Sequence, residues 1–236
     1  MNDASARRLP ESAPGRVYVW ELPVRVTHWA IFLSVVVLCV TGTYIGRPFS
    51  AGGATTDRFV MGIMKVVHFY AAIVFDVALA ARIGWMFFGN RYACWDQFIP
   101  LTRERWRGFV KTTKFYCFLR HSFPETIGLN PMLGLLFVGI FALELLMAAT
   151  GFALYSVLAP IGSPMRVFRF LVPILGGLQD ARWTHHVGMW LLITLVLAHI
   201  IAVVVISVAQ RSDMIGSIFS GYKLIVDRQD GERDNG

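Results

Sequence analysis

Apolar residues gather into four long runs along the chain, and polar segments separate the runs. The runs lie at about residues 24–45, 59–88, 131–158 and 185–208. A helix needs about 20 mostly apolar residues to cross the hydrocarbon core of a bilayer, and each run reaches that length. The pattern therefore predicts four transmembrane helices.

The composition supports lipid as the solvent of this chain. Hydrophobic residues make up 56% of the 236 residues and charged residues only 16%. A water-soluble fold of this size could not bury so much apolar surface. We therefore predict an all-α membrane protein, a four-transmembrane-helix bundle formed by residues 17–226. Residues 1–16 are expected to be a flexible N-terminal segment, and residues 227–236 a tail.

The net charge of +7 is distributed as in a membrane protein. Four cations precede or begin the first apolar run, seven lie between the second and third runs, and four lie in the tail, whereas the other two connections carry two and three. Cytoplasmic segments of membrane proteins are enriched in Lys and Arg, so both termini are predicted to be cytoplasmic. This clustering beside apolar runs argues against nucleic acid as a partner.

Two connecting segments are predicted to lie at the membrane interface. Residues 95–123 alternate aromatic with basic residues, as an amphipathic segment on the cytoplasmic surface would; a solvated loop is the alternative. Residues 167–175 are apolar but too short to span the bilayer, and they are expected to form an interfacial helix.

Five histidines fall on or at the ends of the predicted helices. They are His28, His68, His185, His186 and His199. Ionisable groups inside a bilayer are costly and usually serve a function, although a single histidine can also simply bond two helices. Neutral imidazoles can bind haem iron on both axial faces without a covalent link. No CxxCH sequence occurs, so covalent haem attachment is excluded, and the pattern favours b-type haem between the helices.

The positions of the histidines predict two haem sites. His185 and His199 are 14 residues apart, which places them on one helix face, about 40° and about 21 Å apart. By depth, His68 pairs with His185 near the outer surface, and His28 pairs with His199 nearer the inner surface. His186 remains an alternative to His185.

Four other ionisable residues lie in or beside the apolar runs. Arg25 and Arg82 are predicted near the inner surface, where they could bind haem propionates or extend to lipid headgroups. Glu144 and Asp76 could belong to a proton path or pair within the bundle.

Two sequence signatures resemble those of the b-type cytochrome subunit of membrane-bound nickel–iron hydrogenases. The resemblance extends over about residues 17–226. The signatures are Arg25-Val26-Thr27-His28-Trp29 with Leu38-Cys39-Val40-Thr41-Gly42, and His185-His186-Val187-Gly188-Met189-Trp190 with His199.

This resemblance implies a place in electron transfer. The small and large subunits of a nickel–iron hydrogenase, on the periplasmic side, would pass electrons to one or two haem b groups. The cytochrome would then reduce menaquinone or ubiquinone in the bacterial cytoplasmic (inner) membrane. In the family pattern the first of the two adjacent histidines is fixed, which favours His185 over His186. The chain has no paired CxxC motifs for a nickel–iron centre, so we expect an electron-transfer subunit without hydrogenase chemistry of its own.

Two other functions stay open from the sequence. The cytochrome b subunit of a formate dehydrogenase, or another b561-like quinone oxidoreductase, would share the four helices and the paired histidines. A haem-free transporter or membrane anchor would need the helices alone.

Overall fold

The computed structural model describes residues 16–49, 54–119, 129–210 and 214–224. Most of the predicted N-terminal segment and all of the predicted tail lie outside these residues.

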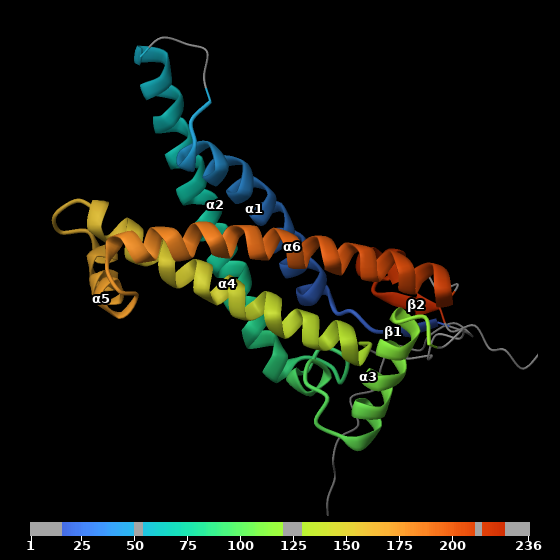
Figure 1. Cartoon of the computed structure of the whole chain (residues 1–236). Helices are drawn as coiled ribbons and strands as arrows, with labels where there is room; N and C mark the ends of the chain where they lie inside the picture. Colours follow the sequence, from blue (N-terminus) through green and yellow to red (C-terminus); the bar gives the residue numbers. More distant parts are fainter. Residues whose placement is uncertain (1–15, 50–53, 120–128, 211–213, 225–236) are drawn as a thin grey trace, which may run out of the picture. The chain divides into compact units, whose positions relative to one another are not determined.

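Four long helices dominate the described chain, as the apolar runs predicted. They are α1 (Leu22–Gly46), α2 (Ala54–Phe88), α4 (Pro131–Leu158) and α6 (Leu178–Gln210) (Figure 1). Each contains a stretch long and apolar enough to cross a bilayer. The chain is therefore a multi-pass membrane protein.

The last of these helices begins earlier than its apolar run. The sequence predicted a start near residue 185, but α6 begins at Leu178. The residues in between are mostly polar, so they fall outside a hydrophobic pattern although they readily form helix. Asp180 in the first turn also favours helix formation, because a carboxylate interacts well with the helix N-terminus. As a result, His185 lies two turns inside the helix.

The chain divides into two compact units. The helical unit comprises the described residues within 26–84 and 136–198, and the terminal unit comprises the described residues within 16–25, 85–135 and 199–224. In the helical unit all four long helices contribute to one buried core. Its buried members are Val35, Phe75, Leu79, Ile140 and Leu192.

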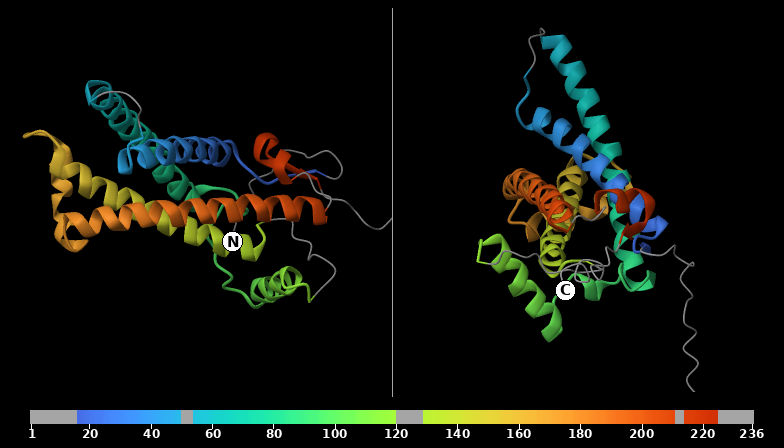
Figure 2. Two further views of the ribbon diagram at one scale, coloured as in Figure 1. Left: turned by 45° about the horizontal axis from the view of Figure 1, so that its top comes forward. Right: turned by 90° about the vertical axis from the view of Figure 1, so that its right-hand side faces the viewer.

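A connecting segment of the helical unit joins α4 to α6. It contains the 3₁₀ helix η2 (Pro164–Phe170) and the short α5 (Leu171–Ile174), at the ends of the two long helices (Figure 2). The ring of Phe168 stacks on Phe152 of α4, with ring centres 4.5 Å apart. The predicted helix over 167–175 is thus replaced by these two shorter helices.

The terminal unit joins the two ends of the described chain. Strand β1 (Arg16–Tyr18) pairs antiparallel with β2 (Tyr222–Leu224), and α7 (Met214–Ser220) precedes β2. The indole N–H of Trp20 donates to the Ser217 hydroxyl at 3.1 Å. The two ends of the membrane domain are therefore held together.

Helix α3 (Arg103–Tyr116) of the same unit lies within the predicted amphipathic segment. The Thr102 hydroxyl caps it by accepting from the Arg105 N–H at 3.2 Å. Trp106 and Phe109 stack on one another, and Trp106 is exposed. The segment is therefore largely helical, and its place at the membrane interface stays a prediction.

Candidate functional site

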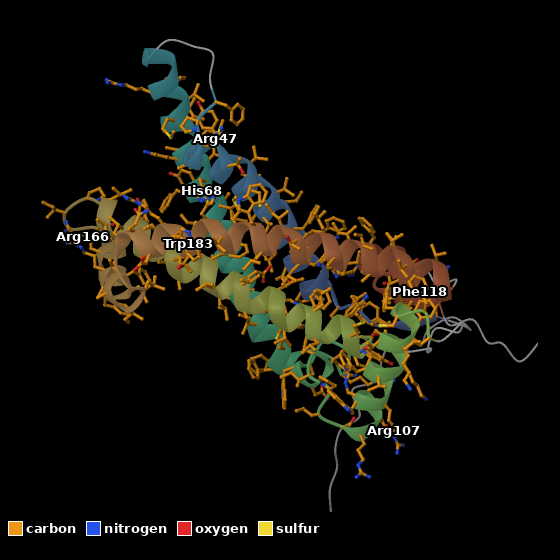
Figure 3. All side chains as sticks on the ribbon, viewed as in Figure 1. Arg47, His68, Arg107, Phe118, Arg166 and Trp183 are labelled. Carbon is orange, nitrogen blue, oxygen red and sulfur yellow. The ribbon has the colours of Figure 1, made fainter. Side chains whose placement is uncertain are left out.

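His68 of α2 is held by two consecutive residues of α1. Its Nδ1 atom lies 2.8 Å from the Thr41 hydroxyl oxygen. A Cβ atom added at Gly42 would lie 3.3 Å from His68 Cε1, so the ring edge packs directly against the glycine. Figure 3 labels His68 on α2. The imidazole thus has a fixed place against α1.

His185 of α6 has matching surroundings on α4. Its Nδ1 atom lies 2.7 Å from the Thr150 hydroxyl oxygen. A Cβ atom added at Gly151 would lie 3.6 Å from His185 Cε1. The two histidines therefore each pack against a Thr-Gly pair of a neighbouring helix.

The structure brings these two histidines near one another. His68 and His185 are close enough to interact electrostatically, and both are half-buried in the helical unit. Met189 follows His185 by one turn of α6, and its sulfur would lie 3.7 Å from a Cβ atom added at Gly42. His68 and His185, which were predicted to form the outer pair, thus pack beside Gly42 and Gly151 respectively.

His186 has different surroundings from His185. Its side chain is exposed, and its Nε2 accepts from the Trp190 indole N–H at 3.4 Å. Its ring lies beside Gly46 of α1 rather than beside a Thr-Gly pair. Of the two adjacent histidines, His185 is the one that shares its surroundings with His68.

The predicted inner pair is divided between the two units. His28 belongs to the helical unit, where its ring meets Trp29 edge to face with centres 5.5 Å apart. His199 belongs to the terminal unit and is half-buried. The pairing of His28 with His199 stays a prediction.

The two arginines predicted as propionate partners already have other interactions. Arg25 donates from its guanidinium to the Phe219 carbonyl oxygen at 2.5 Å. Arg82 is 7% exposed and interacts electrostatically with Glu144, which is 3% exposed. Both roles of Glu144, a proton path and pairing within the bundle, stay predictions. Binding of propionates by either arginine stays a prediction.

The residues around His68 and His185 fit a haem. A porphyrin supplies four iron ligands itself, so two imidazoles complete the coordination. The glycines beside both rings keep side-chain atoms away from the imidazole edges. Among the described residues, no group of three or more His, Cys, Asp or Glu is arranged to hold a bare metal ion. Two imidazole donors are the number that an iron already held by a porphyrin would need.

The contacts of the two threonines with His68 and His185 were not predicted from the sequence. Thr-Gly occurs at only two places in the sequence, 41–42 and 150–151, and both lie in apolar runs. This repetition was the available signal. A helical threonine usually bonds its own backbone, so the dipeptide by itself did not indicate a contact with histidine.

Comparison with known proteins gives a consistent result across nearly the whole chain. Residues 19–221 match the model of a family described as prokaryotic cytochrome b561. A relative from Bradyrhizobium diazoefficiens is 37% identical over 227 residues, covering 94% of this chain and 90% of the relative. One from Cupriavidus necator is 35% identical over 214 residues, 89% of this chain and 88% of the relative. Both are named probable Ni/Fe-hydrogenase B-type cytochrome subunits.

A relative from Escherichia coli extends the same similarity. It is 36% identical over 211 residues, covering 87% of this chain and 90% of the relative. Its name is probable Ni/Fe-hydrogenase 1 B-type cytochrome subunit. The family match over residues 19–221 includes all four long helices and both Thr-Gly pairs.

Proposed function

Because the chain belongs to the prokaryotic cytochrome b561 family, we propose that it is the b-type cytochrome subunit of a membrane-bound nickel–iron hydrogenase. The observation that carries the proposal is the matched pair of His68 and His185, each held against a Thr-Gly pair. A membrane anchor or transporter without haem would not need two imidazoles in equivalent settings.

His68 and His185 would hold one haem b through its iron. The haem, when bound, supplies a single-electron carrier that cycles between ferric and ferrous iron. The chain contributes the position of this carrier and its surroundings. The buried core of the helical unit, which includes Phe75 and Leu192, keeps water away from the interior. Low polarity around the haem then helps to set its potential.

His28 and His199 would hold a second haem, with Arg25 and Arg82 as candidate propionate partners. In this scheme the hydrogenase small and large subunits would dock on the periplasmic side, and the two histidine pairs would hold the carriers that relay electrons across the membrane. Menaquinone or ubiquinone in the bacterial inner membrane would then accept them. The pairing of β1 with β2 supports a common side for both ends of the described chain. The excess of cations in the same segments supports the cytoplasmic side.

The proposal is tested on the chain purified with its associated subunits. We expect a b-type α band in the reduced-minus-oxidised spectrum and reduction of the haem by H2. His68→Ala and His185→Ala should abolish the outer haem signal, whereas His186→Ala serves as the matched control and should retain it. Haem per chain, measured as the pyridine haemochrome, should be two in the wild type; a value of one would limit the assignment to the outer site.

The alternatives give different outcomes. A partner without nickel and iron, with formate rather than H2 as reductant, would assign the chain to a formate dehydrogenase or related complex. A purified chain with no α band would end the haem proposal. Full haem content in both His68→Ala and His185→Ala would show that the ligand pair is wrong.

A further inference from the structure

We propose that Thr41 and Thr150 are positioning residues that fix His68 and His185 as the tautomer with hydrogen on Nδ1 and direct both Nε2 atoms to the haem iron. This inference rests on the proposed function, since it assumes that the two histidines are the axial ligands. It assigns a role to two residues that do not themselves contact iron.

The direction of the hydrogen bond at Thr41 follows from proton count. Its hydroxyl oxygen lies 2.7 Å from the backbone carbonyl oxygen of Val37 and 2.8 Å from His68 Nδ1. A carbonyl oxygen can only accept, so the single hydroxyl proton is used in the bond to Val37. The hydroxyl oxygen must therefore accept from His68, and Nδ1 carries the hydrogen.

The same reasoning holds at Thr150. Its hydroxyl donates to the Leu146 carbonyl oxygen at 2.7 Å and lies 2.7 Å from His185 Nδ1. The hydroxyl oxygen must therefore accept from His185, and Nδ1 of His185 carries the hydrogen.

The burial of both threonine hydroxyls favours the same tautomer. Thr41 is 4% exposed and Thr150 is 0% exposed, so water does not compete at either hydroxyl. In a neutral imidazole only one ring nitrogen carries hydrogen, so Nε2 of each histidine keeps its lone pair. Nε2 is the atom that can then bind iron.

The neighbouring glycines complete the arrangement. The ring edge that carries Nδ1 and Cε1 packs over Gly42 in one case, and Cε1 packs over Gly151 in the other. In each Thr-Gly pair the threonine hydroxyl therefore accepts the hydrogen bond from the imidazole, and the glycine leaves room for the imidazole ring. A hydrogen bond from Nδ1–H increases the basicity of a ligating imidazole and fixes its ring orientation. A more basic ligand stabilises ferric iron, so the two threonines should hold the haem potential down.

The test replaces each hydroxyl by a methyl group of similar size. In Thr41→Val and Thr150→Val the haem midpoint potential should shift upward in a redox titration. Haem retention should fall by on the order of tenfold or more, since loss of such supporting bonds costs that much in metal affinity. Thr41→Ser and Thr150→Ser keep the hydroxyl and should stay close to the wild type in both measurements.

Two threonines of the same helical unit serve as matched controls. Thr43 on α1 and Thr194 on α6 donate to their own backbone at 2.7 and 2.9 Å, and neither has a described bond to a histidine. Thr43→Val and Thr194→Val should leave the potential and the haem content unchanged. If they shift the potential as much as the site variants do, the effect belongs to helix structure and the inference is wrong.

Failure of the inference is distinct from failure of the proposed function. If His68→Ala and His185→Ala keep full haem, the ligand assignment itself fails. If those two lose haem while both valine variants match the wild type, the assignment stands and the role of the threonines is refuted. Should a valine variant not accumulate, the serine variant decides: a serine chain with a shifted potential or without haem overturns the inference.

Discussion

Removal of the Glu21 side chain should loosen the terminal unit, because this carboxylate joins the start of α1 to the end of α2. Its Oε2 atom accepts from the Trp85 indole N–H at 2.9 Å and from the Asn90 backbone N–H at 2.8 Å. Asn90 in turn donates from its side chain to the Val19 carbonyl oxygen at 3.1 Å. Glu21→Ala would leave two donors without their acceptor.

The size of the effect follows from these two bonds. A hydrogen bond to a charged group contributes about 1.5–3 kcal/mol. Trp85 and Asn90 are only half-buried, so water can partly replace the lost oxygen, and the lower end of the range applies. Two such bonds at the lower end of the range mean that Glu21→Ala should cost about 3 kcal/mol in total. In a chain of this size that corresponds to a fall of roughly 6–12 °C in the unfolding midpoint.

The assay is thermal unfolding of the purified complex in detergent, with the apparent midpoint as the measured quantity. Glu21→Gln keeps a neutral acceptor and should lose about half as much. Glu104→Ala removes an exposed glutamate of α3 in the same unit and should change the midpoint little. Equal midpoints for Glu21→Ala and Glu104→Ala would refute the reasoning, because they would show that the two bonds contribute nothing.

Three further outcomes follow from the terminal unit and can be checked separately. Gly134→Ala should destabilise the protein by about 1–3 kcal/mol in thermal unfolding, because the new Cβ would lie 2.8 Å from two backbone oxygens. Gly62→Ala is the control: its Cβ would have nothing within 4 Å, and it should not destabilise the protein. Burial lowers the pKa of Lys223 from 10.5 to about 8. Between these two pH values the unfolded chain binds more protons than the folded chain, so the free energy of unfolding should rise with pH. The stability gained by Lys223→Met at pH 7 should therefore be smaller at pH 9.5, and an equal gain at both pH values would contradict this. An impermeant maleimide should label the exposed Cys117 from the cytoplasmic side only. It should label Cys117 faster than Cys94, because burial raises the pKa of the Cys94 thiol. Labelling of Cys117 from the periplasmic side would contradict the predicted orientation.

The long helices could be predicted from the sequence because the bilayer imposes a minimum apolar length. That criterion gives the part of a helix that lies in lipid and not its polar extension, which is why the start of α6 at Leu178 was missed. The strands β1 and β2 were also missed. Each has three residues, too few for an alternating pattern, and their partners lie about 200 residues apart in the sequence.

The candidate site shows a similar division. Helix rise relates sequence position to depth, and on that basis His68 was predicted to pair with His185; the two side chains are close enough to interact electrostatically, and their pairing at a haem stays a prediction. Depth could not separate His185 from His186, which depends on the direction of each side chain. Nor could it identify Thr41 and Thr150, since their hydroxyls bond both their own backbone and a distant ring. Such shared bonds become visible only when neighbouring helices are placed together.

The pairing of β1 with β2 also constrains when the protein can be completed during synthesis. Trp20 and Ser217 bond across 197 residues, so this contact forms only after the last helix has left the ribosome. At about 5–20 residues per second, the N-terminal strand waits some tens of seconds for its partner. A chain that stops before Tyr222 would retain all four long helices and both candidate ligands, yet it would present β1 as an open strand edge. The pairing of β1 with β2 is therefore present only in a chain that has been synthesised as far as β2.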